Sequence, residues 1–299
     1  MKIMVSGLVN IETTVAVRGF PIGYYPIDYP FFGVNSDVSG VGYNVAKALS
    51  ALGDKVSLFS FAGKDDEGKR IFERMRSDGI GTNGVFDTLS ATPASAVLFA
   101  PDGRRQIYCD LKDIQEQNIS PRVGDEELKS FDAAALCNIN FNRELIKRAK
   151  ALGVTVATDV HVLGNIDDGY NRDFMENADI LFLSDEALPC DAGEFIRRLE
   201  DRYHNSVIVI GMGAKGAMLF DKKTGEISFV DAYHRDGVVN TVGAGDALFS
   251  SFLHFYLKSG DAKGSLRRAV VFAGVKICYN GASVGFSSEE ETERIFRDR

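Results

Sequence analysis

A glycine-rich turn followed by an apolar run is the segment of this 299-residue sequence best suited to chemistry. Residues 237–257 read GVVNTVGAGDALFSSFLHFYL: a β-like start, a Gly-Ala-Gly turn at 243–245 and then apolar residues at helical spacing. Such a turn points unpaired N–H groups and the positive end of a helix dipole into one concavity, which can stabilise a phosphoryl group in transfer. Asp246, in the first helical turn, could accept the proton of a hydroxyl that attacks this group.

The same residues also have a purely structural interpretation. An acidic residue is favourable at any helix N-terminus, and glycines serve many tight turns. The turn alone therefore does not separate a phosphate site from an ordinary helix start, and the rest of the sequence has to decide.

Polar side chains that could bind a substrate follow two other predicted turns. Residues 39–46 read SGVGYNVA, in which small residues let backbone N–H groups approach substrate hydroxyls and Asn44 offers a donor and an acceptor to a polyol. Asn10 and Glu12 follow the first predicted strand, at the edge where ligands bind in open α/β sheets. The structural alternatives are an asparagine near a helix start and a solvated loop carboxylate at Glu12.

The elements that must position these side chains alternate between β-rich apolar runs and stretches of helical periodicity. This alternation is typical of a parallel sheet covered by helices. The predicted strands are 3–7, 55–63, 154–160, 178–184 and 206–213, and the predicted helices are 38–52, 67–78, 144–152 and 265–278. No linker or internal repeat divides the chain, so we predict one doubly wound α/β domain over residues 1–299.

Two segments break this alternation and predict a small β-sheet lid outside the main sheet. Residues 12–36 are rich in aromatics, Gly and Pro, and 95–110 contain two β-rich runs joined by Pro-Asp-Gly. We place the lid at about 12–36 and 92–111. Arg104 and Arg105 follow the hairpin turn, where they could bind a substrate carboxylate or phosphate or simply be exposed charges.

Composition limits the classes of protein and partner. The 45% of hydrophobic residues can form a substantial core, and the net charge of −8, from 34 Lys plus Arg against 42 Asp plus Glu, disfavours binding to nucleic acid or to anionic membranes. No run reaches membrane-spanning length, and the first residues do not read as a signal peptide. The four dispersed cysteines form no zinc or disulfide pattern, so we expect a reduced, cytoplasmic protein.

The glycine turn and the Asn44 segment together resemble two signatures of the ribokinase-like (PfkB) family of carbohydrate and nucleoside kinases. Residues 240–249, NTVGAGDALF, are similar to the family's Asp-Thr-x-Gly-Ala-Gly-Asp string and hydrophobic helix. Residues 39–46 are similar to its Gly-Gly-x-x-x-Asn-x-Ala string, with Ser39 in place of one glycine. The resemblance covers nearly the whole chain and implies an enzyme that uses ATP and Mg²⁺ to phosphorylate a hydroxyl of a small sugar or sugar-like polyol.

The resemblance also implies roles for individual residues. Asp246 would be the catalytic base, beside an anion hole formed by Gly243, Ala244 and Gly245. The candidate substrate site includes positions similar to the family's, together with Asn140 at the end of a predicted strand and Arg104 in the predicted lid. Its residues are Asn10, Glu12, Gly40, Gly42, Asn44, Asn140 and Arg104. The nucleotide would lie along Ser184, Gly211, Gly213, Lys215, Gly216, Gly281 and Ala282.

Three further positions depart from the family pattern at places that bear on ion binding. Asn240 replaces an Asp that in several members helps to hold an activating potassium ion, so potassium activation lacks its usual carboxylate here. Ser184 and Ala187 stand where the family has the Asn and Glu of its magnesium-ordering motif. Asp185 or Glu186 could substitute, because magnesium needs only one or two protein carboxylates and often binds them through water.

Three functions stay open on this basis. A sugar or sugar-acid kinase suits the polar set around Asn44. A nucleoside kinase, with pseudouridine among its possible substrates, is the second, since a base could stack on Tyr24, Tyr25, Phe31, Phe32 or Tyr108. A non-catalytic ligand-binding protein of the same fold is the third, although the intact Gly-Ala-Gly-Asp string argues against it. Residues 20–32 would be lid packing or a dimer surface, because lids in this family often pair between subunits.

Overall fold

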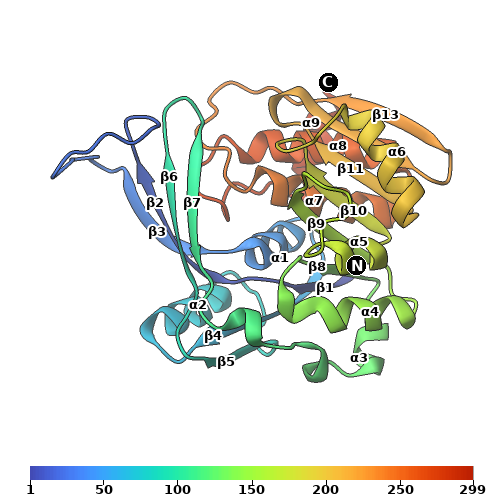
Figure 1. The fold of residues 1–299 in the computed structure, drawn as a ribbon, viewed down its shortest axis with the longest axis horizontal. Coiled ribbons are helices and arrows are strands. Elements are labelled where there is room, and N and C mark those ends of the chain that lie inside the picture. The colour runs from blue at the N-terminus through green and yellow to red at the C-terminus, as the bar shows by residue number, and fades with distance from the viewer. Residues whose placement is uncertain (299) are drawn as a thin grey trace.

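A nine-stranded sheet forms the body of the computed structural model, which describes residues 1–298 (Figure 1). The strand order is β13-β12-β11-β10-β9-β8-β1-β4-β5. Neighbouring strands from β11 to β5 are parallel, whereas β12 and β13 pair antiparallel. The strands are β1 (Lys2–Ser6), β4 (Lys55–Gly63), β5 (Val85–Leu89), β8 (Ala133–Leu136), β9 (Val156–Val162), β10 (Ile180–Ser184), β11 (Val207–Gly211), β12 (Gly216–Asp221) and β13 (Glu226–Asp231). The predicted doubly wound, mainly parallel sheet is confirmed.

Helices cover both faces of this sheet. Successive side chains of a strand point to opposite faces, and those of the central strands are apolar on both faces. In β1, Ile3 and Val5 belong to one core cluster and Met4 to the other. Helices α1, α2, α7 and α8 pack in the first cluster, and α4, α5 and α6 in the second. The helices are α1 (Val41–Ala51), α2 (Asp66–Ser77), α3 (Asp125–Lys129), α4 (Arg143–Ala151), α5 (Arg172–Asn177), α6 (Ala192–Tyr203), α7 (Ala244–Ser259), α8 (Ala262–Lys276) and α9 (Glu289–Arg297). Within residues 1–298, none of them combines the length and apolar character that crossing a membrane requires.

The start of the first helix differs from the prediction. Strand β3 (Val34–Ser39) occupies the first positions of the predicted helix, and α1 begins only at Val41. Gly40 turns the chain between them at φ 104°, and a Cβ there would lie 2.5 Å from the Leu8 carbonyl oxygen. Val38 fits the apolar spacing of the helix equally well, so periodicity alone could not find this boundary.

The predicted lid is a separate four-stranded sheet in the order β3-β2-β6-β7. It adds β2 (Asn10–Ala16), β6 (Ala94–Phe99) and β7 (Arg105–Asp110) to β3. The two chain segments meet where β2 and β6 pair in parallel, as expected from their separation in the sequence. In Figure 1 the lid stands on the left, beside the main sheet.

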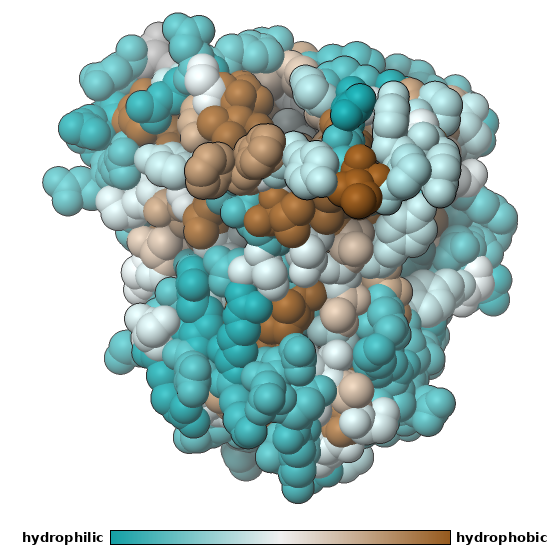
Figure 2. Space-filling model, turned by 90° about the vertical axis from the view of Figure 1, so that its left-hand side faces the viewer, coloured by the Kyte–Doolittle hydropathy of each residue, from teal (hydrophilic) through white to brown (hydrophobic). Residues whose placement is uncertain are grey.

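The connection between β2 and β3, residues 17–33, forms a lid tip with unusual surface chemistry. Its large apolar side chains are exposed to solvent, and Phe32 is fully so. Figure 2 shows the lid side of the molecule, where apolar surface forms a band between polar regions. The exposed apolar residues of the tip are Ile22, Tyr24, Tyr25, Ile27, Tyr29, Phe31 and Phe32.

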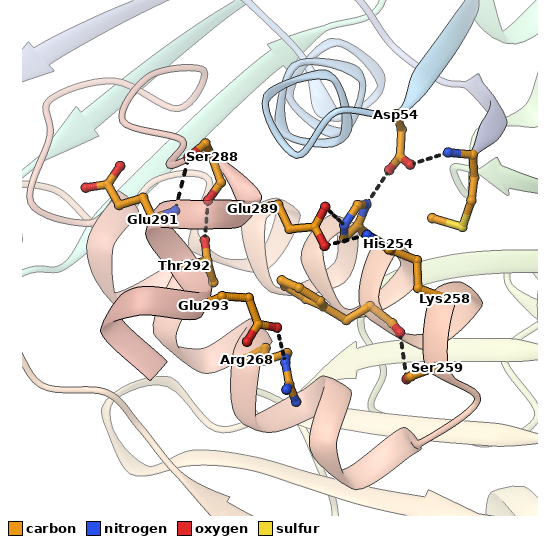
Figure 3. Close-up of polar contacts among 12 residues, drawn as sticks. Asp54, His254, Lys258, Ser259, Arg268, Ser288, Glu289, Glu291, Thr292 and Glu293 are labelled. Atoms are coloured by element: carbon orange, nitrogen blue, oxygen red, sulfur yellow. Dashed lines mark hydrogen bonds and ion pairs between the residues drawn. The ribbon is translucent and has the colours of Figure 1, made fainter. Parts of the chain in front are cut away.

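A largely buried polar network fixes α7 at the end that lies away from its glycine turn (Figure 3). Nδ1 of His254 lies 2.8 Å from Oδ2 of Asp54, and its Nε2 lies 3.5 Å from Oε2 of Glu289. The other oxygen of Asp54 accepts a hydrogen bond from the amino group of Met1 at 2.9 Å. Hydrogen-bond partners on both oxygens replace the lost hydration of the buried Asp54 carboxylate. The network therefore joins β1, the α1–β4 turn, α7 and α9.

Candidate active site

The glycine turn and the Asn44 segment, far apart in the sequence, meet in the structure. Asp246 lies in the first turn of α7 and is only 9% exposed, and Asn44 lies in the first turn of α1. Nδ2 of Asn44 donates a hydrogen bond to Oδ2 of Asp246 over 2.7 Å. Because α1 and α7 also pack in one core cluster, helix packing supports this contact. The structure therefore brings both sequence signatures into one site.

Burial shifts the pKa values of two carboxylates at this site. Burial raises the pKa of Asp246, and it outweighs the hydrogen bond from Asn44 and the charge of His161, which lower it. Burial also raises the pKa of Glu12 in β2, and the negative charge of Asp246 raises it further. A carboxylate whose pKa lies above the ordinary range accepts a proton more readily, which suits a general base.

The glycine turn has the geometry of an anion site. Gly243 has φ 78°, and a Cβ there would lie 2.5 Å from the carbonyl oxygen of Ala282, so only glycine fits. The Ala244 N–H donates to the Thr241 carbonyl at 3.2 Å. Among the residues that the structure describes, the amides of Gly243 and Gly245 have no acceptor, so they remain available to a bound anion.

Asn240 supports this turn as a neutral amide. Its Oδ1 accepts a hydrogen bond from the Val242 N–H at 2.8 Å, and its Nδ2 donates to Oδ1 of Asn280 at 3.2 Å. The adjacent Gly281-Ala282 pair packs under the turn, and Ala282 forms a small apolar cluster with Val242 and with Val97 of the lid. The lid and the candidate nucleotide loops are therefore in contact.

The two lid arginines, which the sequence could not tell apart, have different surroundings. Arg104 stays at the hairpin tip, where its Nε bonds to Asp102 at 2.8 Å and its Nη2 to the Phe20 carbonyl at 2.9 Å. Arg105 reaches the glycine turn, with its Nη1 3.4 Å from Oγ1 of Thr241. The structure thus places Arg105, and not the predicted Arg104, beside the candidate site.

Asn10 has an unused acceptor in the candidate substrate site. Its side chain is 2% exposed, its Nδ2 donates to Oγ of Ser95 at 3.1 Å, and its Oδ1 has no partner among the described residues. Buried polar atoms are rarely left unpaired, so a ligand hydroxyl is a suitable donor for this oxygen.

Close packing requires a glycine at position 42 of the candidate substrate site. A Cβ there would lie 2.6 Å from the backbone of Gly7.

Both polar atoms of the Asn140 side chain already have protein partners. Its Nδ2 donates to the Gln115 carbonyl at 3.2 Å, and its Oδ1 accepts a bond from Nε of Arg143 at 2.6 Å. Its backbone N–H is bound to the Gln115 side chain as well. These contacts give Asn140 a structural role, and its binding to a substrate stays a prediction.

Five of the predicted nucleotide-binding residues lie at the end of β10 or between the end of β11 and the start of β12, whereas Gly281 and Ala282 follow α8. The Asp185 N–H donates to the Gly211 carbonyl at 2.9 Å, which joins the end of β10 to the β11–β12 turn. In that turn Gly216 has φ 125°, Gly213 is exposed, and the Lys215 side chain extends into solvent. The Oγ of Ser184 is buried and has no partner among the described residues.

The predicted metal ligands form only a sparse donor set. Asp185 is partly buried, and Glu186 is exposed and lies 3.8 Å from Arg105. Within residues 1–298 no group of three or more His, Cys, Asp or Glu side chains could enclose a metal ion. One or two carboxylates at a phosphate site still suit Mg²⁺, which keeps several waters and takes its other ligands from the nucleotide.

Sequence reasoning missed one charged group at this site, Lys276. The apolar spacing of the predicted helix 265–278 indicated core packing, and a lysine in such a helix is normally solvated. In the structure Lys276 is fully buried, and its ammonium donates to the carbonyl of Val242, next to the glycine turn. The only signal in the sequence was a lysine among apolar neighbours.

Comparisons with known proteins bear on the fold and the activity. The family model described as pfkB family carbohydrate kinase matches residues 1–289. The deoxyribokinase of Salmonella typhi is 26% identical over 304 residues, which cover 97% of this chain and 97% of that protein. The microbiome-derived acarbose kinase Mak1 has a similar structure, with a TM-score of 0.86, 25% identity and coverage of 99% of this chain and 98% of that one.

A further solved structure adds a nucleotide complex. It is a candidate ribokinase II from E. coli in complex with ATP and Mg²⁺. Its TM-score is 0.81 at 19% identity, over 100% of this chain and 99% of that one. At this identity the likeness shows a shared fold.

Proposed function

Because this chain belongs to the pfkB family of carbohydrate kinases, we propose that it transfers the γ-phosphate of ATP to one hydroxyl of a small sugar or sugar-like polyol, with Asp246 as the general base. As a family member it is a phosphotransferase whose acceptor is an alcohol group. The observation that carries the residue assignment is the buried pair of Asp246 and Asn44 beside the unpaired amides of the turn at 243–245.

Residues of this chain can act as the base, the anion site and the substrate-binding groups in the phosphoryl transfer. Asp246 takes the proton of the substrate hydroxyl as its oxygen attacks the γ-phosphorus, and the bond to the ADP oxygen breaks. The amides of Gly243 and Gly245, with the N-terminus of α7, stabilise the charge on the phosphoryl oxygens. Asn44 orients Asp246 and, with Asn10 and Glu12, binds neighbouring hydroxyls of the substrate.

ATP would extend from the turn at 243–245 over the ends of β10 and β11. Its contacts would be the backbone of the β11–β12 turn, Ser184 and the Gly281-Ala282 pair, with Lys215 free to approach a phosphate. Mg²⁺, when bound, would neutralise phosphate charge and be held through water by Asp185 and Glu186. The need for ATP and the four free cysteines support a reducing compartment such as the cytoplasm.

Several observations favour a polyol as the acceptor. The unpaired Oδ1 of Asn10 and the carboxylate of Glu12 offer acceptors to hydroxyl groups. The aromatic residues considered for stacking a nucleoside base lie mainly on the lid tip, where Tyr24 is 90% and Phe31 85% exposed. The similar proteins named above are described as kinases of carbohydrates, which supports the same class of acceptor.

The proposal is tested by ADP release from ATP and Mg²⁺ with pooled sugars, sugar acids and nucleosides. We expect release with a pool of sugars, because the candidate site presents hydroxyl-binding groups close to Asp246. If only the pool of nucleosides supports ADP release, the protein is a nucleoside kinase instead. If ATP binds and no pool supports ADP release, a non-catalytic ligand-binding role becomes the better interpretation.

The lid tip supports a second proposal, a homodimer formed through the lids. Exposed apolar patches of this kind on one short segment commonly mark contact surfaces. We expect Phe31→Ser combined with Phe32→Ser to convert a dimer into a monomer in analytical ultracentrifugation. Phe229→Ser, which changes an exposed phenylalanine on β13, is the control and should leave the assembly unchanged. A wild-type protein that is monomeric at the same concentrations would contradict the proposal.

A further inference from the structure

Lys276, in the last turn of α8, is a lysine whose side chain is completely buried. Its side chain has no exposed surface and ranks among the largest fully buried ones in the protein. An ammonium group loses much favourable hydration on burial, so buried lysines are rare unless they have partners. Among the residues that the structure describes, Lys276 forms no ion pair, and its hydrogen bond goes to the backbone carbonyl of Val242.

The peptide that this lysine holds is the one that enters the glycine turn. The carbonyl of Val242 and the N–H of Gly243 belong to the same peptide unit, and in a trans peptide they point in opposite directions. With its carbonyl bound to the ammonium, the peptide directs the Gly243 N–H away from Lys276, and no described residue accepts that N–H. A cation on the carbonyl also polarises the peptide and strengthens its N–H as a donor.

The charges around Lys276 are those of the candidate active site. Burial lowers the pKa of Lys276 to about 8, while Asp246 on α7 and Glu12 on β2 raise it and Arg105 on β7 lowers it. The side chain therefore carries its charge near neutral pH despite its burial. The two carboxylates stabilise this positive charge. ATP bound at the glycine turn would add further negative charge near it.

We propose that Lys276 is a positioning residue, a built-in cation that holds the Val242–Gly243 peptide in the orientation that a phosphoryl group requires and offsets the negative charge gathered at the turn. The inference rests on the proposed function of Gly243 and Asp246. It has a consequence for cofactors: the turn carries its own cation, so turnover does not require a free monovalent ion.

Removing the ammonium tests this role directly. Lys276→Ala should lower kcat by about 10²–10³-fold, the typical cost of losing one donor at an oxyanion site, with a much smaller change in KM for the sugar. Ammonium ions, which can enter the vacated space, should restore part of kcat, whereas a purely structural defect would not respond to them. Lys263→Ala, at an exposed position of the same helix, is the control and should match the wild type.

The wild type provides a second test that does not depend on the folding of a variant. Its ADP release should be equal in potassium, sodium and choline buffers. Strong activation by potassium would overturn the inference, as would a Lys276→Ala variant with normal kcat. These outcomes differ from a failure of the proposed function, in which the wild type itself would release no ADP with any pool of substrates.

Discussion

Replacing Asp246 with asparagine is expected to lower kcat by about 10²–10⁴-fold while ATP still binds. Asparagine keeps the shape of the side chain but cannot take the proton of the attacking hydroxyl. The carboxylate lies at the start of α7, is only 9% exposed and is held in position by Asn44. ADP release and the Kd for ATP, measured by calorimetry, separate the loss of chemistry from a loss of binding.

The control for this variant is Asp231→Asn, which removes an exposed carboxylate from β13. It should turn over at the wild-type rate. The pH profile gives an independent readout, because burial raises the pKa of Asp246. The base is ionised only above that pKa, so kcat/KM should fall as the pH is lowered, and the fall should begin at a higher pH than an ordinary aspartate would give. Wild-type turnover in Asp246→Asn would refute the assignment of the base.

Gly243→Ala is expected to abolish measurable turnover and to lower stability as well. At φ 78° an alanine is strained by about 1–2 kcal/mol, and its Cβ would lie 2.5 Å from the Ala282 carbonyl oxygen. Relieving this contact requires the turn to move, which displaces the amides that we assign to the phosphoryl group. Urea unfolding and kcat, measured on the same preparation, record both effects.

Gly79→Ala is the matched control for the strain alone. Gly79 follows α2 at φ 71°, and a Cβ there would meet no atom within 4 Å. This variant should lose a similar 1–2 kcal/mol of unfolding free energy and keep full activity. If Gly243→Ala instead behaves like Gly79→Ala, the geometry of the turn is not needed for transfer.

The fold could be predicted from the sequence to a large extent, because its signals are local. Strands such as Val207–Gly211 are apolar, β-branched and bounded by turn residues, so their burial on both faces can be read from the residues themselves. The lid followed from two β-rich segments that interrupt the alternation. The family resemblance implied that Asn44 and Asp246 serve one active site, and the structure adds the direct hydrogen bond between them.

The charged details of the candidate site could not be predicted, because they depend on contacts between distant segments. Arg104 and Arg105 are chemically equal, and only the packing of the lid hairpin against the turn separates them. The helix pattern around Lys276 gives no sign of the Val242 carbonyl that receives its ammonium. Gln115, which binds Asn140 across 25 residues of the chain, likewise lies on a segment whose position no local signal specifies.

The hydrogen bond between Asn44 and Asp246 has a consequence for how the protein is made, since it spans 202 residues. Contacts of such long range form late and slow folding, because a long loop must close before they can add stability. During synthesis β1 emerges first, yet it lies inside the sheet between β8 and β4, and β8 follows more than a hundred residues later. A ribosome that stops before α7 releases a chain with much of its sheet and neither the base nor the glycine turn.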